Sequence, residues 1–187
     1  MKDLNKLPVD LPIPVDDGAC DHLLHSNVPS VFLKSVSNKS IDLSSIEGMV
    51  VIFFYPMNGR PDSPPMIGWN DIPGARGCTP QACSFRDSYA NLEALNVQVF
   101  AVSSQALEDQ KEASSRLALP FEILNDAQLK LTNAMNLPTF EYKSSTYIKR
   151  VTLIAIGGVI KKVFYPVFPP DKNVIDVIEW VENNHSL

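Results

Sequence analysis

Cysteine, basic charge and long apolar runs are all in short supply in this sequence, and each shortage excludes a class of protein. Three cysteines are an odd number, which does not suggest the paired framework of a small secreted protein. The longest apolar run, Met49 to Tyr55, is too short to cross a bilayer as a helix. With 16 Lys and Arg against 21 Asp and Glu, the net charge of −5 offers nucleic acid no basic surface.

The N-terminal residues are polar and rich in proline, without the apolar core of a signal peptide. We therefore expect a soluble, cytoplasmic protein with no membrane or nucleic-acid partner. A length of 187 residues with 45% hydrophobic side chains suits one domain with a real core. We expect an irregular arm over residues 1–27 and a single domain over residues 28–187, because no repeat or linker separates two cores.

The spacing of apolar residues alternates between strand-like and helix-like along the chain. Val50 to Tyr55 is β-branched and aromatic on both faces, which is typical of a central strand covered on both sides. The order of elements predicts an α/β protein of thioredoxin-like layout, in which a central mixed β-sheet is flanked by helices on both faces. The other expected strands are 31–33, 39–43, 97–102, 121–124, 150–156 and 159–165, and the expected helices are 78–95, 107–117, 126–135 and 174–181.

Residues 57–73 hold too many prolines and glycines to form a regular helix or strand. A loop of roughly this length is uncommon inside a compact domain and is often functional. Ile67 and Trp69 give the loop apolar side chains with which to anchor itself. Two interpretations stay open: a tolerated surface loop, or a lid that narrows access to a site or makes a dimer contact.

Cys78 and Cys83 lie where this loop passes into a predicted helix. A helix N-terminus offers unpaired N–H donors and positive potential, which can lower a thiol pKa from about 8.5 to the range of about 3.5 to 7.5. Cys78 is placed for this effect. If both cysteines are helical, their Cα atoms lie roughly 8 to 9 Å apart, whereas a disulfide needs less than about 7 Å. A bond between them therefore requires the helix start to unwind; alternatively, Cys83 is a small core residue.

The cysteine run resembles a known enzyme family. Phe54-Tyr55-Pro56 followed by Gly77-Cys78-Thr79-Pro80-Gln81-Ala82-Cys83-Ser84-Phe85-Arg86-Asp87 resembles the peroxiredoxins, with most similarity to the bacterioferritin-comigratory, or peroxiredoxin Q, branch of the AhpC/TSA family. Arg150-Val151-Thr152-Leu153-Ile154 looks like the later Arg-x-Thr/Ser-Phe strand of that family. The resemblance extends from about residue 31 to the C-terminus.

The resemblance implies a thiol-dependent peroxidase for hydrogen peroxide and alkyl hydroperoxides, active as a monomer or homodimer without cofactor or metal. Cys78 would be the peroxidatic cysteine, which becomes a sulfenic acid. Cys83 would be the resolving cysteine, which forms an intramolecular disulfide with Cys78, as in an atypical 2-Cys enzyme. Arg150 would stabilise the thiolate and polarise the peroxide. A thioredoxin or similar dithiol would reduce the disulfide.

Two positions depart from the family pattern Pro-x-x-x-Thr-x-x-Cys, because Ala75 replaces the threonine and the proline is displaced to Pro56 by the insertion of residues 57–73. We expect Pro56 to stay at the strand end and to pack over the site. Either Thr79 or another group in the loop replaces the missing hydroxyl, or peroxide activation is weaker. Arg86 is a third candidate for substrate binding, by ordering the helix start; otherwise it pairs with Asp87 at the surface.

Other functions and sites remain as alternatives. A thioredoxin-like disulfide oxidoreductase favours Cys-x-x-Cys, whereas this chain has Cys-x₄-Cys. A non-catalytic redox sensor would be oxidised once per chain without turnover. Cys20, His22 and His25 are close in sequence, but three ligand types without a fourth give only a weak metal signal. We expect no metal site, a buried or substitute resolving Cys20, and a solvent-exposed His185.

Overall fold

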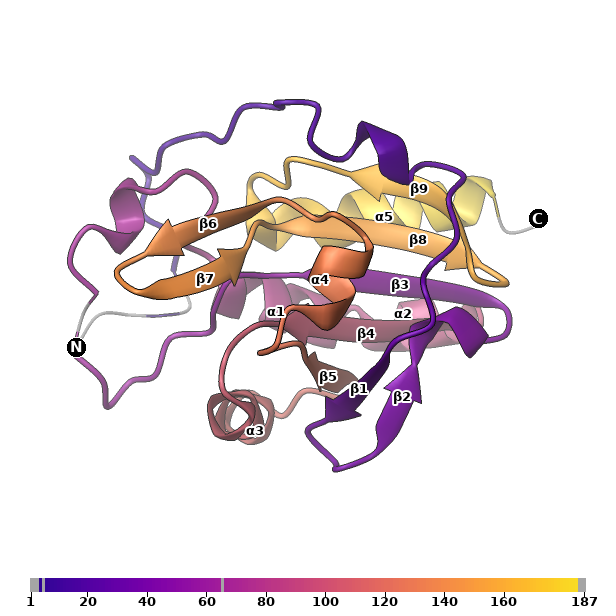
Figure 1. The fold of residues 1–187 in the computed structure, drawn as a ribbon, viewed down its shortest axis with the longest axis horizontal. Helices are drawn as coiled ribbons and strands as arrows, with labels where there is room; N and C mark the ends of the chain where they lie inside the picture. The colour runs from indigo at the N-terminus through magenta and orange to yellow at the C-terminus, as the bar shows by residue number, and fades with distance from the viewer. Residues whose placement is uncertain (1–3, 5, 65, 185–187) are drawn as a thin grey trace.

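The computed structural model describes residues 4, 6–64 and 66–184, and its described strands form a central seven-stranded sheet in the order β2-β1-β5-β4-β3-β8-β9 (Figure 1). β4 runs parallel to β3 and β5, whereas β8 runs antiparallel to β3 and β9. This mixed sheet confirms the expected thioredoxin-like α/β fold. The strands are β1 (Phe32–Ser35), β2 (Ser40–Asp42), β3 (Met49–Phe54), β4 (Val97–Ser103), β5 (Glu122–Asn125), β8 (Val151–Ile156) and β9 (Val159–Phe164).

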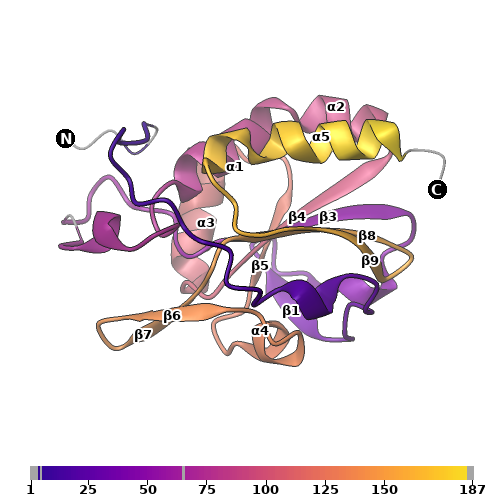
Figure 2. The ribbon, with the colours of Figure 1, turned by 90° about the horizontal axis from the view of Figure 1, so that it is seen from above.

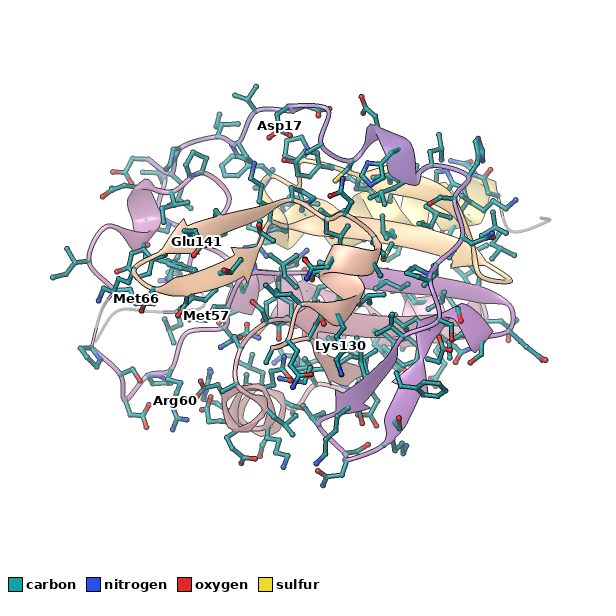
Figure 3. The ribbon with its side chains drawn as sticks, in the orientation of Figure 1. Asp17, Met57, Arg60, Met66, Lys130 and Glu141 are labelled. Carbon is teal, nitrogen blue, oxygen red and sulfur yellow. The ribbon has the colours of Figure 1, made fainter. Side chains whose placement is uncertain are left out.

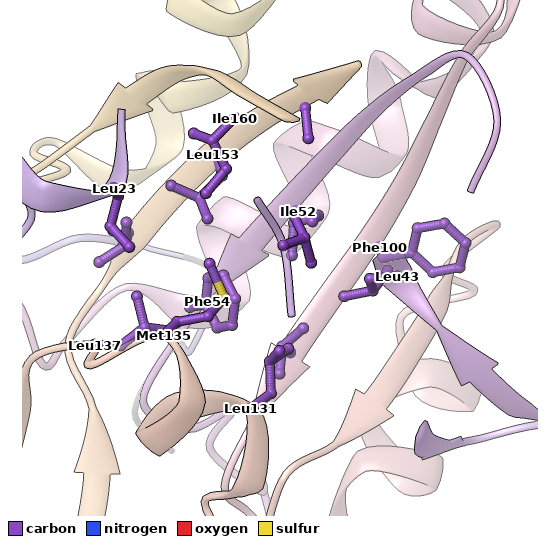
Figure 4. Packing of buried hydrophobic residues seen from close by; sticks show 14 of the residues in the cluster. Leu23, Leu43, Ile52, Phe54, Phe100, Leu131, Met135, Leu137, Leu153 and Ile160 are labelled. Carbon is purple, nitrogen blue, oxygen red and sulfur yellow. The ribbon is translucent and has the colours of Figure 1, made fainter. Parts of the chain in front are cut away.

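Alternate residues of β3 face two separate halves of the core. Ile52 and Phe54 lie with α4 (Lys130–Ala134) and the N-terminal segment, as the packing in Figure 4 shows. Phe53 lies on the opposite face, under the helices α1, α2 and α5. Figure 2 shows these two layers on either side of the sheet. Each fully buried side chain of this kind contributes about 1.5 to 3 kcal/mol through its removal from water.

The helices follow the expected apolar spacing with two differences. The helix expected over residues 126–135 is shorter, because α4 begins only after Leu129, which adopts the left-handed conformation. The helix expected over residues 78–95 is divided into α1 (Cys78–Asp87) and α2 (Tyr89–Ala94), because Ser88 adopts φ −101° and ψ 3°, outside helical geometry. The remaining helices are α3 (Leu107–Arg116) and α5 (Asn173–Asn183), with short 3₁₀ turns η1 (Asp21–Leu23), η2 (Leu43–Ser45), η3 (Trp69–Asp71) and η4 (Pro170–Lys172).

A hairpin that the sequence did not lead us to expect lies outside the main sheet. It consists of β6 (Thr139–Tyr142) and β7 (Ser145–Ile148), which pair antiparallel. Along β6 the side chains alternate between exposed and half-buried, so this strand carries no continuous apolar run. Its apolar side faces the loop of residues 57–73.

The end of the N-terminal arm covers an edge of the sheet. The amides of His25 and Val28 donate to the carbonyls of Ile160 and Gly158 at 2.9 and 2.8 Å. The arm is therefore irregular but bound to β9, which leaves less free edge. Residues 1–3 and 5 of the arm and the expected exposed His185 lie outside the described residues, and the domain boundary at residue 27 stays a prediction. Over the described ranges, no helix is long and apolar enough to cross a membrane.

Candidate active site

Cys78 is the first residue of α1, and glycine is required just before it. Gly77 adopts φ 110°, and a Cβ there would overlap Pro170 of η4 and lie 2.8 Å from Leu7 Cδ2. Only a residue without a side chain allows the helix start to approach η4 so closely. The Cys78 side chain is consequently held in the core, with only 3% of the residue exposed.

The pairing of β3 with β8 brings Arg150 to Cys78. Phe54 at the end of β3 lies opposite Val151 at the start of β8, so the residues just beyond these two ends meet at one edge of the sheet. Arg150 Nη2 lies 3.2 Å from the Cys78 Sγ, and the Met57 amide donates to the same sulfur at 3.4 Å. This places positive charge and a backbone donor against the sulfur, as a thiolate nucleophile requires.

Buried polar side chains hold the guanidinium of Arg150 in place. Its Nη1 donates to Gln81 Oε1, and its Nη2 donates to the Gly74 carbonyl at 3.2 Å. Gln81 Nε2 in turn donates to Asn173 Oδ1 at 3.0 Å, and Thr152 Oγ1 donates to the same oxygen at 2.7 Å. Because all four polar side chains are at most 3% exposed, each depends on the others for its hydrogen bonds.

Cys83 lies on the same helix as Cys78, and the described cysteines are all free thiols. Burial raises the pKa of Cys83, an effect that the nearby Arg86 partly offsets. Since both cysteines are helical, the Cα separation expected from the sequence applies, and a disulfide between them requires α1 to unwind.

The other predicted site residues lie in different surroundings. Thr79 is 3% exposed and lines the same cavity as Cys78. Pro56 is buried at the end of β3, where its carbonyl accepts from Ser103 Oγ at 3.0 Å, and its neighbour Met57 makes the contact with sulfur. Arg86 does not line the cavity: it donates to the Leu117 carbonyl at 2.9 Å and to Asp87 at 2.8 Å.

The loop of residues 57–73 forms one wall of a cavity of about 630 Å³ that includes Cys78. Trp69 anchors the loop, being 6% exposed and packed on three aromatic rings of the β6–β7 hairpin at centroid distances of 5.0 to 5.7 Å. Arg60 pairs with Asp109 of α3 at 3.1 Å. In Figure 3, Met57 and Met66 lie on this loop near the hairpin that carries Glu141, whereas Arg60 lies towards α3. These contacts favour a packed wall of the site over a loose surface loop.

Asn58 lines the cavity but was not singled out from the sequence, and Tyr55 was named only as part of the predicted strand and of the Phe54-Tyr55-Pro56 run. The Asn58 amide donates to Gln105 Oε1 at 2.7 Å, and Gln105 Nε2 donates to the Asn58 carbonyl at 3.1 Å. Both polar atoms of the Asn58 side chain and the Tyr55 hydroxyl are buried without a hydrogen-bond partner among the described residues. No local pattern in the sequence signals the contacts of Asn58 and Tyr55. Gln81, a hydrogen-bond partner of Arg150, could have been found from its spacing, because it lies one turn after Cys78.

Cys20 is separated from this site by the sheet. It packs with Ile52 and Phe54, whereas Cys78 packs on the opposite face, so Cys20 is badly placed to act as a substitute resolving cysteine. Burial raises the pKa of Cys20 to about 12, with the charge of Asp17 adding to the effect. Among the described residues, no group of three His, Cys, Asp or Glu is arranged to hold a metal ion.

Comparisons with known proteins identify the family of this chain and agree with its fold. The Redoxin family profile matches residues 24–178. Chloroplastic peroxiredoxin Q from Sedum lineare is 28% identical over 160 residues, covering 84% of this chain and 77% of the relative. The corresponding Triticum aestivum protein is 26% identical over 166 residues, covering 88% and 69%.

Solved structures show the same fold. Peroxidoxin BcpB from Mycobacterium tuberculosis superposes with a TM-score of 0.70 at 20% identity, covering 86% of this chain and 96% of that one. The bacterioferritin comigratory protein of Xanthomonas campestris gives a TM-score of 0.68 at 15% identity, covering 94% and 99%. The chain therefore belongs to the Redoxin family, as a peroxiredoxin Q-like member of the AhpC/TSA peroxiredoxins.

Proposed function

We propose that this protein reduces hydrogen peroxide and alkyl hydroperoxides at Cys78, with Cys83 as the resolving cysteine and Arg150 as the group that activates both thiolate and peroxide. Membership of the peroxiredoxins supports a thiol-dependent peroxidase. The contact of 3.2 Å between Arg150 Nη2 and Cys78 Sγ carries the assignment of residues. The Xanthomonas relative is described by its alkyl peroxide reduction activity, which supports the proposed substrate class.

In the first step the Cys78 thiolate attacks the terminal oxygen of the hydroperoxide. An S–O bond forms as the O–O bond breaks, and the departing alkoxide takes up a proton to become an alcohol, or water when the substrate is hydrogen peroxide. The sulfur is oxidised to a sulfenic acid while the peroxide is reduced. Arg150 stabilises the negative charge that moves from the sulfur to the departing oxygen.

In the second step Cys83 attacks the Cys78 sulfenic acid and water leaves as the disulfide forms. The first turns of α1 must unwind for this step, because both thiols lie on that helix. A thioredoxin-type dithiol then reduces the disulfide and becomes a disulfide itself. The cytoplasm, whose dithiol reductants keep thiols reduced, suits this cycle.

The decisive experiment follows NADPH consumption with thioredoxin, its reductase and either hydrogen peroxide or an alkyl hydroperoxide. We expect sustained turnover by the wild type and none by Cys78→Ser. Cys20→Ser is the matched control and retains turnover, because Cys20 lies across the sheet. Full turnover by Cys78→Ser would overturn the proposal. A single oxidation per chain without turnover would instead favour the redox sensor.

A further inference from the structure

The Asn58 side chain is an unusual feature of the cavity beside Cys78. Only 3% of this residue is exposed, yet neither Oδ1 nor Nδ2 has a hydrogen-bond partner among the described residues. Leaving a buried polar group unpaired typically costs about 1 to 3 kcal/mol, so such a group requires an explanation.

The backbone of Asn58 is fixed in the wall of the cavity that contains Cys78. Gln105 holds both the amide and the carbonyl of Asn58, and the preceding residue, Met57, donates its amide to Cys78 Sγ. Asn58 and Cys78 line the same cavity. The unsatisfied amide therefore belongs to the cavity that a small molecule would enter to reach the sulfur, one residue after the backbone donor to Cys78.

Tyr55 does not line the cavity, but it brings a second unpaired polar group close to Asn58 and Cys78. Its hydroxyl is buried beside the Asn58 side chain, close enough for that side chain to offset part of the rise that burial causes in the Tyr55 pKa. The two groups do not complete a hydrogen bond of ordinary geometry. Burial and the neighbouring charge of Cys78 raise the pKa of Tyr55, so the hydroxyl keeps its proton and remains a donor. Ala75, by contrast, is buried but offers no polar side chain to a ligand.

A carboxamide and a hydroperoxide are complementary in their hydrogen bonds. The amide presents an acceptor and a donor side by side, and a hydroperoxide presents an O–H donor next to an oxygen acceptor. A carboxamide can therefore bind both oxygens of one hydroperoxide. The unpaired atoms are one acceptor, Asn58 Oδ1, and two donors, Asn58 Nδ2 and the Tyr55 hydroxyl. The acceptor suits the O–H of a hydroperoxide, and the donors suit its other oxygen.

We propose that the Asn58 carboxamide, together with the Tyr55 hydroxyl, binds the peroxide group beside Cys78. Asn58 Oδ1 accepts the hydrogen of the terminal oxygen, and Asn58 Nδ2 and the Tyr55 hydroxyl donate to the oxygen that departs. Asn58, which belongs to the inserted loop, thereby provides hydrogen bonds to the peroxide that the side chain of Ala75 cannot provide. The inference rests on the proposed role of Cys78 as the residue that peroxide oxidises.

The test compares two reactions of Cys78 in chains that all carry Cys83→Ser. One reaction is oxidation by hydrogen peroxide, and the other is modification by methyl methanethiosulfonate, which reports the reactivity of the sulfur towards a reagent without a peroxide group. We expect Asn58→Leu to slow peroxide oxidation about 10- to 100-fold, and Tyr55→Phe to slow it about 3- to 10-fold. Modification by the thiosulfonate should stay within about 2-fold of the parent chain.

Asn91→Leu is the matched control, since it makes the same change on the exposed side of α2, and both rates should stay at the parent values. Circular dichroism checks that each variant is folded, and Asn58→Ala replaces Asn58→Leu if the larger side chain prevents folding. Parent-like peroxide oxidation in the Asn58 variant would overturn the inference, as would an equal loss in both reactions. If the parent chain itself reacts with the thiosulfonate but not with peroxide, the proposed function fails.

Discussion

Arg150 and Cys78 are 72 residues apart in the sequence, yet Nη2 of the arginine lies 3.2 Å from Sγ of the cysteine. The contact exists because β8 pairs antiparallel with β3, which brings the start of one strand to the end of the other. The helix start at Cys78 and the hydrogen bond that Arg150 donates to Gln81 complete the arrangement. The chemistry proposed for the chain depends on this contact.

Removing the Arg150 guanidinium should slow the first oxidation of Cys78. We expect Arg150→Met to lower the second-order rate constant for hydrogen peroxide about 100-fold, because the stabilisation of charge on the departing oxygen is lost. Arg150→Lys should recover part of the rate, since it keeps the charge but not the forked contact with both Gln81 and Cys78. Stopped-flow measurement of peroxide consumption in a single turnover reports this constant. Arg86→Met, which alters a guanidinium outside the cavity, should leave it unchanged, and an equal loss in both variants would contradict the assignment.

The glycine before Cys78 should be intolerant of any side chain. Gly77→Ala places a methyl group against Pro170 at a positive φ, so we expect it to lower the free energy of unfolding by about 2 kcal/mol or more. Gly48→Ala is the matched control: Gly48 has φ 77°, but no atom lies within 4 Å of the added Cβ. Urea denaturation of both variants measures the difference. Equal losses would show that the close approach of η4 contributes nothing.

The anchor of the inserted loop offers a test of its function. Trp69→Ala should loosen the loop, because the indole loses its contacts with Phe140, Tyr142 and Tyr147. If the loop limits access to Cys78, the ratio of kcat/KM for cumene hydroperoxide to that for hydrogen peroxide should rise. An unchanged ratio in a folded variant would show that the loop does not limit access to Cys78 and has only a structural role.

The buried thiol of Cys20 predicts a loss of stability in alkali. Its folded pKa of about 12 exceeds the ordinary value of 9.0 because burial disfavours the thiolate. The unfolded chain therefore releases its proton first, so this contribution to stability is complete below pH 9 and is lost as the pH rises towards 12. Urea denaturation across this range should show a steeper loss for the wild type than for Cys20→Ala. Parallel curves would contradict the buried neutral thiol.

The sequence predicted some parts of this structure well, for physical reasons. The run from Val50 to Tyr55 is apolar on both faces, and only a central strand covered on both sides suits that pattern. The helix start at Cys78 followed from the change between a Gly/Pro-rich loop and helical spacing. Arg150 was found by resemblance, since nothing local distinguishes it from another strand arginine.

Other parts depend on contacts that no local pattern encodes. The β6–β7 hairpin is only half-buried and gains its apolar partner, Trp69, from a distant loop. Asn173 lies 92 residues from Gln81, and the bond between them appears only once α5 lies beside α1. Asn58 could not be identified from the sequence as a site residue. Its distinguishing feature is a buried side chain without a hydrogen-bond partner among the described residues, and this feature exists only in the folded chain.

The most direct measurement of the central claim is the intact mass of the protein after one equivalent of hydrogen peroxide, without a reductant. The wild type should lose the mass of two hydrogen atoms, as Cys78 and Cys83 form a disulfide. Cys83→Ser should gain the mass of one oxygen atom at Cys78, and Cys78→Ser should keep its mass. An oxygen retained on the wild type, or a disulfide that includes Cys20, would contradict the proposed pairing within α1.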